Sequence, residues 1–175
     1  DFNQSLRHRV ALLAGLTTAQ LEEVAARITP MPGATALVST MKANGTVTAL
    51  VSGGFTVFIE QVAARLGFDR HFGNGLEIAT GRLTGRVLEP ILDATAKRDL
   101  LLGLAAENGL ALAGVLAVGD GANDIPMLEA AGLGVAFRAK LAVRAAMLNS
   151  PTGAVIDHGD LSALLHLQGL PSPAD

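Results

Sequence analysis

The stretch VLAVGDGAND (Val115–Asp124) decides the fold class, because it joins an apolar strand to a loop of glycines and oxygen-bearing side chains. Pro126 follows, in the first turn of the helix expected next. A short apolar strand that leads through a loop into a helix is the repeating unit of α/β folds. Since strands and helices alternate along most of the chain, the sequence predicts a mostly parallel sheet with helices on both faces.

The pattern outside this stretch predicts the other elements. Helices are expected at 34–43, from about Phe55 to Leu66, at 95–108, up to Ala131, at 139–148 and at 161–167. Strands are expected at 46–51, 115–118, 133–137 and 154–156, with a β-hairpin at 76–87.

Residues 1–28 read as two helices. Thr17 and Gln20 form a capping box for the second. The segment PMPG at 30–33 forbids a helix and marks a boundary. We therefore divide the chain into residues 1–28 and residues 29–175, with a tail expected at 171–173.

The composition of the chain excludes several classes of ligand and partner. The chain has 175 residues, of which 50% are hydrophobic and 3% aromatic, and a net charge of −3, so it can bury a core but lacks the basic, aromatic surface that binds nucleic acid. It has no cysteine, so any metal would sit among oxygen ligands, which favours magnesium over zinc. The longest apolar stretch, Leu100–Val118, is interrupted by polar residues, and no secretory signal opens the chain. A cytoplasmic protein without a membrane partner is expected.

Two predicted strands end in polar loops, where α/β sheets bind ligands. After Val51, the residues Ser52-Gly53-Gly54 lead into a helix, and a hydroxyl, two glycines and a helix N-terminus suit an anion. The alternative is an ordinary turn in which Ser52 caps the helix. After Val118, two carboxylates and an amide crowd the loop at Asp120, Asn123 and Asp124, which favours a hard divalent cation. Helix capping would explain Asn123 or Asp124 but not Asp120.

Two cations are also candidates. Lys97 opens a helix, where the helix dipole disfavours a cation unless it faces an anion, although most lysines are merely solvated. Arg9 shares a helical face with Phe2 and could bind a small carboxylate, although an ordinary salt-bridged arginine is the simpler alternative.

Together these segments resemble the phosphoserine phosphatases of the haloacid dehalogenase superfamily, over nearly the whole chain. Asp1–Val10 (DFNQSLRHRV) is similar to part of a substrate-capping helix, and Leu50–Phe55 (LVSGGF) to the phosphate-binding motif. Lys97 stands where the superfamily's lysine is expected, and Val118–Asp124 (VGDGAND) is similar to the metal motif. The resemblance implies a Rossmann-like core at 29–175, with residues 1–28 as the C-terminal part of a helical cap.

The resemblance also implies roles for the polar residues. Asp120 would bind Mg²⁺, and Asp124 would support the metal and its waters. Ser52 and the Gly53 N–H would hold the phosphoryl oxygens, and Lys97 would neutralise their charge.

Substrate recognition is implied for three further residues. Asn123 would orient the phosphate, while Phe2 and Arg9 on the cap would recognise the serine part, Arg9 through its carboxylate. The implied reaction is Mg²⁺-dependent hydrolysis of O-phospho-L-serine through an aspartyl-phosphate, the last step of serine biosynthesis.

The sequence departs from the superfamily in one respect. Superfamily members begin with a strand that carries an Asp-x-Asp pair, a nucleophile and an acid/base, and these 175 residues contain no such pair. We expect the first core strand and the nucleophile to lie before residue 1. Either a missing segment or a second copy, as in a homodimer, completes the sheet, or the fold is rearranged. Without them, the chain should not form the covalent intermediate.

Alternatives remain open. The chain could act on another small phosphorylated metabolite, it could be a catalytically dead fragment that only binds phosphate, or it could be a noncatalytic binding module. A nucleotide-binding domain is disfavoured, because no Gly-x-Gly-x-x-Gly pattern follows the first predicted strand.

Overall fold

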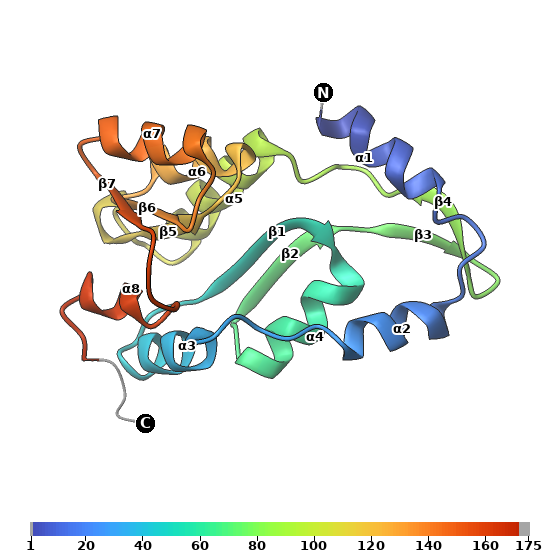
Figure 1. Cartoon of the computed structure of the whole chain (residues 1–175), viewed down its shortest axis with the longest axis horizontal. Coiled ribbons are helices and arrows are strands. Elements are labelled where there is room, and N and C mark those ends of the chain that lie inside the picture. Colours follow the sequence, from blue (N-terminus) through green and yellow to red (C-terminus); the bar gives the residue numbers. More distant parts are fainter. Residues whose placement is uncertain (1, 172–175) are drawn as a thin grey trace. The chain divides into compact units, whose positions relative to one another are not determined.

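The computed structural model describes residues 2–171, which form two compact units (Figure 1). Unit 1 combines Asp1–Ile91 with Gly159–Asp175, and unit 2 is Leu92–His158. The first residue of the predicted cap and part of the predicted tail lie outside the described residues. The boundary predicted at residues 28 and 29 falls within unit 1, and the division into cap and core stays a prediction.

Unit 1 holds a parallel strand pair and a hairpin. Its helices are α1 (Phe2–Ala11), α2 (Thr18–Ala26), α3 (Ala34–Ala43), α4 (Thr56–Leu66) and α8 (Ala163–His166). Its strands are β1 (Ala49–Phe55), β2 (Arg70–Asn74), β3 (Leu76–Ala79) and β4 (Arg82–Val87). β1 pairs with β2 in parallel, and β3 and β4 form the predicted antiparallel hairpin. The predicted capping box is confirmed, since Thr17 Oγ1 accepts the Gln20 N–H at 3.2 Å and Gln20 Oε1 accepts the Thr17 N–H at 2.9 Å.

A small apolar cluster in unit 1 connects α1 with the strands. Leu6 and Val10 of α1 are buried together with Ile91. Phe2, at the start of α1, and Phe55, at the end of β1, both pack against this cluster. The first helix and the carboxyl end of β1 therefore share one core.

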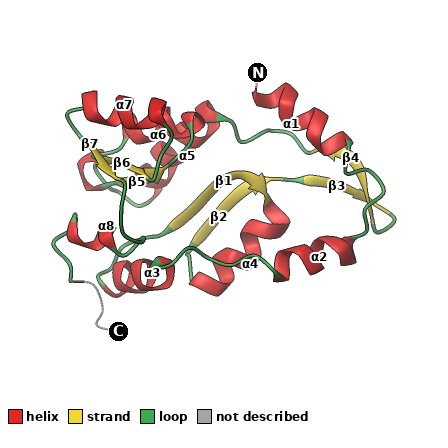
Figure 2. Ribbon diagram, viewed as in Figure 1, coloured by secondary structure: helices red, strands yellow, loops and turns green. Residues whose placement is uncertain are grey.

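Unit 2 is a parallel sheet covered by helices (Figure 2). Its helices are α5 (Ala94–Glu107), α6 (Ile125–Ala130) and α7 (Leu141–Asn149), with 3₁₀ turns η1 (Leu112–Gly114) and η2 (Ala122–Asp124). Its strands β5 (Leu116–Gly119), β6 (Leu133–Phe137) and β7 (Gly153–Ile156) pair in parallel in that order. The core combines Leu101 of α5, Leu128 of α6, Ala136 of β6 and Met147 of α7. Burial of these apolar faces is the main stabilising contribution to such a unit.

The predicted α/β class with parallel strands is confirmed, but the strand predicted at 46–51 is wrong in its bounds. β1 begins at Ala49 and continues to Phe55, and all of its residues are half-buried rather than buried. The preceding residue, Thr48, donates its N–H and its hydroxyl to Asp69 Oδ2, at 2.8 and 2.9 Å, and so belongs to the turn before the strand. Each helix of the described residues is too short or too polar to reach across a membrane.

Candidate active site

The first polar loop of the sequence lies inside β1, as a bulge near its carboxyl end. Val51 pairs with Phe72 and Phe55 pairs with Asn74, so three residues of β1 lie opposite one residue of β2. The three residues are Ser52, Gly53 and Gly54, two more than regular pairing with Gly73 would allow, and the regular ladder is interrupted there. The structure therefore places the predicted phosphate loop in a strand bulge, not after the strand.

The bulge is stabilised by its own hydroxyl. The Gly54 N–H donates to Ser52 Oγ at 3.1 Å. The N-cap of α4 is Phe55, which makes no side-chain capping bond, so the alternative in which Ser52 caps the helix is wrong. Among residues 2–171, the Ser52 hydroxyl has no acceptor of its own, and its proton remains available to a ligand.

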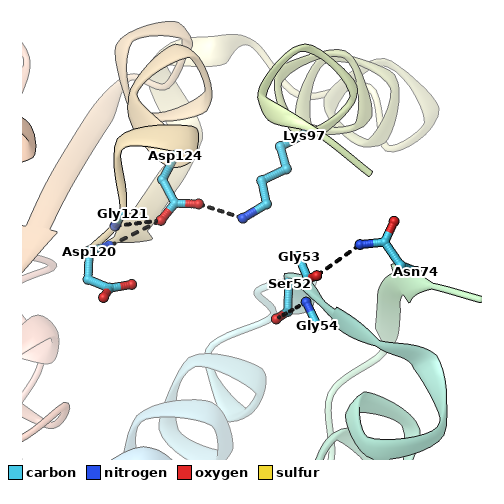
Figure 3. Close-up of polar contacts among 8 residues, drawn as sticks. All are labelled: Ser52, Gly53, Gly54, Asn74, Lys97, Asp120, Gly121 and Asp124. Atoms are coloured by element: carbon cyan, nitrogen blue, oxygen red, sulfur yellow. Dashed lines mark hydrogen bonds and ion pairs between the residues drawn. The ribbon is translucent and has the colours of Figure 1, made fainter. Parts of the chain in front are cut away.

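Two residues of β2, Gly73 and Asn74, contact this bulge, and neither was predicted from the sequence. A Cβ on Gly73 would lie 2.3 Å from Ile59 Cδ1 and 3.1 Å from the Gly54 carbonyl oxygen, so glycine lets β2 approach closely. Asn74 is 0% exposed, and its Nδ2 donates to the Gly53 carbonyl at 2.9 Å (Figure 3). The signal in the sequence was a glycine–asparagine pair just before the hairpin, which resembles an ordinary turn.

The second polar loop follows β5 in unit 2. Asp124 is buried, and its Oδ2 accepts the N–H groups of Asp120 and Gly121 at 3.2 and 3.0 Å. Its Oδ1 lies 2.6 Å from the Lys97 Nζ, in an ion pair whose side chains are 4% and 9% exposed (Figure 3). Lys97 is therefore not a solvated surface lysine, and that alternative is wrong. The pair is buried and well hydrogen-bonded, as such a pair must be to tolerate desolvation.

Asp120 contrasts with Asp124. It lies at the carboxyl end of β5, is exposed, and its carboxylate makes no hydrogen bond or ion pair with the described residues. A Cβ on Gly119 would lie 2.6 Å from Asp124 Cβ, so glycine is needed for the loop to fold back on itself. Asn123 is half-buried in η2, beside Gly121. Within residues 2–171 there is no group of three or more acidic or histidine side chains around this carboxylate.

The predicted substrate residues of α1 differ in their environments. Phe2 is half-buried against the cluster that also contacts Phe55, which follows the bulge. Arg9 is exposed, and its Nε donates to the Ser5 carbonyl at 3.3 Å. It forms no ion pair within residues 2–171, and its role in substrate recognition stays a prediction.

The structure thus assembles two groups of the predicted residues. In unit 1, Ser52 and Gly53 share the bulge, and Phe2 packs against the same apolar cluster as Phe55, the residue after the bulge. In unit 2, Lys97, Asp120 and Asp124 are linked by hydrogen bonds. That the two groups serve one ligand stays a prediction. A separate cavity of about 500 Å³ in unit 1, lined by residues 30–36, Arg65, Leu66, Asp160 and Ser162, contains none of them.

Comparison with known proteins gives the family. Residues 1–129 match the haloacid dehalogenase-like hydrolases. The chain belongs to this family. Family membership gives the reaction class, a hydrolase, and the substrate has to be argued from the site itself.

Within the haloacid dehalogenase-like hydrolases, the chain is similar to phosphoserine phosphatases. That of Streptomyces coelicolor is 50% identical over 146 residues, which are 83% of this chain and 36% of that protein. That of Lactococcus lactis is 48% identical over 147 residues, which are 84% of this chain and 68% of that protein. A solved phospho-aspartyl intermediate analogue of phosphoserine phosphatase has a TM-score of 0.86 at 38% identity, covering 97% of this chain and 78% of that one. The chain thus spans only part of each relative.

Proposed function

We propose that the chain contributes most of the site of a Mg²⁺-dependent phosphatase that hydrolyses O-phospho-L-serine to L-serine and phosphate, as the last step of serine biosynthesis in the cytoplasm. The observation that carries the proposal is the difference in environment between the two carboxylates of one loop, Asp120 and Asp124. Asp124 accepts hydrogen bonds from Lys97 and two backbone N–H groups, whereas Asp120 is exposed and its carboxylate bonds to no group within residues 2–171. The names of the relatives support the substrate.

The residues present fit Mg²⁺. The exposed Asp120 carboxylate, which has no partner among the described residues, offers the oxygen ligand that this ion prefers. A magnesium site needs only one or two protein carboxylates because the ion retains several waters. Asp120 would bind the ion directly. Asp124 would support the site indirectly, because its Oδ2 accepts the Asp120 and Gly121 N–H groups and so fixes the loop. When bound, Mg²⁺ would neutralise the charge that develops on the phosphoryl oxygens.

The remaining residues would hold the phosphoryl group. Ser52 would donate its hydroxyl proton to a phosphoryl oxygen, and the Gly53 N–H would donate to another. Lys97 uses one of its ammonium protons on Asp124, and its others would neutralise the phosphoryl charge. Asn123 would orient the phosphate. Such positioning and charge stabilisation account for most of the catalysis of phosphoryl transfer.

The nucleophile would come from an aspartate outside these 175 residues, which contain no Asp-x-Asp pair. Its carboxylate oxygen would bond to phosphorus while the bond to the serine oxygen breaks, and a second aspartate would protonate the leaving oxygen and then activate water. A relative solved as a phospho-aspartyl intermediate analogue supports this route. β1 and β5 each hydrogen-bond to one strand within residues 2–171, so each has an open edge where a strand from a further segment or a second copy could add.

The direct test is the release of inorganic phosphate from O-phospho-L-serine. The chain is extended at its N-terminus by a segment carrying the Asp-x-Asp strand of a phosphoserine phosphatase, and is assayed with Mg²⁺ or with EDTA. We expect turnover only with both the segment and Mg²⁺. Binding of phosphate without turnover in the extended chain would support a noncatalytic module instead.

A substitution of Arg9 tests whether the substrate is phosphoserine or another phosphorylated metabolite. Arg9 is exposed and forms no ion pair within residues 2–171, so the guanidinium nitrogens other than Nε, which donates to the Ser5 carbonyl, are available to a substrate carboxylate. In the extended chain, Arg9→Ala should raise KM for phosphoserine and leave KM for a phosphate monoester without a carboxylate unchanged. Arg7, which pairs with Glu89 at 2.7 Å, offers a matched control in Arg7→Ala. An unchanged KM for phosphoserine in Arg9→Ala would favour a different metabolite.

A further inference from the structure

The bulge of β1 raises a structural question, because a bulge leaves backbone groups without ladder partners. Three residues of β1 lie opposite the single residue Gly73, so their peptide groups cannot all pair with β2. A bulge of two glycines has many alternative conformations. Some other contact must select one of them.

Asn74 supplies this contact. Its side chain is completely buried, and it donates from Nδ2 to the Gly53 carbonyl at 2.9 Å. The Gly53 carbonyl and the Gly54 N–H belong to one planar peptide group and point in opposite directions. That same Gly54 N–H donates to Ser52 Oγ at 3.1 Å. One peptide plane is therefore fixed at both ends, by Asn74 on one side and by Ser52 on the other (Figure 3).

This arrangement sets the direction of the Ser52 hydroxyl. Because Ser52 Oγ accepts the Gly54 N–H, the hydroxyl proton must point elsewhere, and within residues 2–171 it donates to no other group. If the peptide between Gly53 and Gly54 rotated, Ser52 would lose this donor, and its hydroxyl would be free to turn.

We propose that Asn74 is a positioning residue of the phosphate loop: by holding the Gly53 carbonyl, it orients the Gly54 N–H and, through it, the Ser52 hydroxyl towards a phosphoryl oxygen. This inference rests on the proposed function, since it names the residue that shapes the proposed phosphate loop. Asn74 itself touches no ligand in this proposal. It acts through the peptide that it holds.

A purely structural role is the competing explanation, because loss of any buried hydrogen bond destabilises a protein. Thr48→Val is a matched control. Thr48 is also buried, also lies in the β1–β2 region, and also makes a side-chain hydrogen bond, to Asp69 at 2.9 Å, but at the opposite end of the strands. It should lower stability without changing phosphate affinity.

The experiment titrates inorganic phosphate, with Mg²⁺ present, into the ¹⁵N-labelled chain and four variants: Asn74→Ala, Ser52→Ala, the double variant and Thr48→Val. We expect Asn74→Ala to weaken phosphate binding by roughly tenfold, as loss of a hydrogen bond to a charged ligand does. The double variant should bind no more weakly than Ser52→Ala alone, because Asn74 acts through Ser52. If Asn74→Ala proves unfolded, Asn74→Asp replaces it, since an ionised carboxylate keeps the shape but cannot donate.

The outcomes separate this inference from the proposed function. If the native chain binds phosphate and Asn74→Ala binds it equally well, or if the effects of Asn74→Ala and Ser52→Ala simply add, the positioning role is wrong and the proposed function stands. If the native chain binds no phosphate, the proposed function fails. The rate of hydrogen exchange of the Gly54 amide then tests whether Asn74 positions the loop. Faster exchange in Asn74→Ala but not in Thr48→Val supports the positioning of the loop, and equal exchange overturns it.

Discussion

The two ends of the β1–β2 pair are built from similar polar groups but use them differently. At the amino end, the Asp69 carboxylate accepts the Thr48 N–H and hydroxyl and pairs with Lys42 at 2.7 Å. At the carboxyl end, the Ser52 hydroxyl accepts one N–H and has no acceptor among the described residues. The first end satisfies its own polar groups, and the second retains a donor for a ligand.

The same contrast recurs within the loop after β5. Asp124 is buried and receives hydrogen bonds from three donors, whereas Asp120 is exposed and receives none from the described residues. Polar groups that are satisfied within the protein contribute to stability, and those that are left unsatisfied at a strand end are candidates for binding. Mutations should therefore separate stability from binding at each pair of positions.

The largest effect on stability is expected from Asp124→Asn. It would leave the buried Lys97 ammonium without its counterion, and breaking a buried ion pair from one side costs about 3–5 kcal/mol. Urea unfolding should show this loss, and Asp120→Asn, four positions earlier in the same loop and exposed, should change the free energy of unfolding by less than about 0.5 kcal/mol. Similar losses for both variants would remove the distinction between the two carboxylates.

For Mg²⁺ binding, in contrast to stability, the largest effect is expected at Asp120. Asp120→Asn removes the proposed anionic ligand and should weaken Mg²⁺ affinity by at least about tenfold, or about 1.4 kcal/mol. Lys97→Ala keeps Asp120 and should have a much smaller effect. Calorimetric titration of the two variants compares them directly, and equal Mg²⁺ affinities would contradict the role of Asp120.

A smaller effect is expected at the amino end of β1. Thr48→Val removes the hydroxyl that donates to Asp69 at 2.9 Å and accepts the Asp69 N–H at 3.2 Å. The free energy of unfolding should fall by about 1 kcal/mol. A hydrogen bond to a charged carboxylate is usually worth more, but the Asp69 side chain is 34% exposed to solvent. Thermal unfolding with and without phosphate measures the stability of Thr48→Val and its stabilisation by phosphate. A change in the stabilisation by phosphate would show that the amino and carboxyl ends of the β1–β2 pair are not independent.

The smallest effect should be that of Asp69→Asn, and it should depend on pH. The Lys42 ammonium, followed by hydrogen bonds from Thr48, lowers the pKa of Asp69 from 3.8 to about 2. Because the folded-state pKa is the lower one, this carboxylate stabilises the fold above its ordinary pKa, and that contribution is lost as pH falls towards 2.

Urea unfolding between pH 7 and pH 2 checks this prediction. The native chain should be the more stable at neutral pH, and the difference from Asp69→Asn should vanish near the acid limit. Since the Asp69 side chain is 34% exposed, added salt should reduce the difference as well. A difference that persists at the acid limit would mean that the carboxylate charge is not its source.

Much of the fold could be predicted where local signals and tertiary structure agree. The strand predicted at 133–137 is β6, with the same bounds, and the helix predicted to end at Gly67 is α4, which ends there because Gly67 adopts a φ of 81°. The helix predicted at 95–108 is α5. The strand is a continuous apolar run, and each of the two helices is followed by a glycine, Gly67 after α4 and Gly109 shortly after α5.

β2 could not be predicted, because Arg70–Asn74 contains no β-branched residue and includes both glycine and asparagine. It forms a strand since β1 offers a parallel edge and α4 returns the chain beside it. Tertiary pairing thus overrides propensity here, and Asn74, the residue that the pairing brings against the bulge, was missed for the same reason.

The candidate site could be predicted in its residue types but not in its contacts. Asp120, Asp124 and Ser52 were recognised because strand ends are where such folds bind ligands. The burial of Lys97 could not be read from the sequence, because it depends on a carboxylate 27 positions away at 2.6 Å. Local patterns locate polar groups, and only the folded chain tells which of them are already satisfied.

The proposed function requires that the Ser52–Gly54 bulge and the Gly119–Asp124 loop serve one phosphoryl group together with Mg²⁺. The most direct measurement is an NMR titration of the ¹⁵N-labelled native chain with inorganic phosphate, with and without Mg²⁺. We predict that the amide resonances of Gly53, Gly54, Asp120 and Gly121 shift with a single dissociation constant, and that this constant is smaller with Mg²⁺. Shifts confined to one loop, or different constants for the two loops, would contradict the claim.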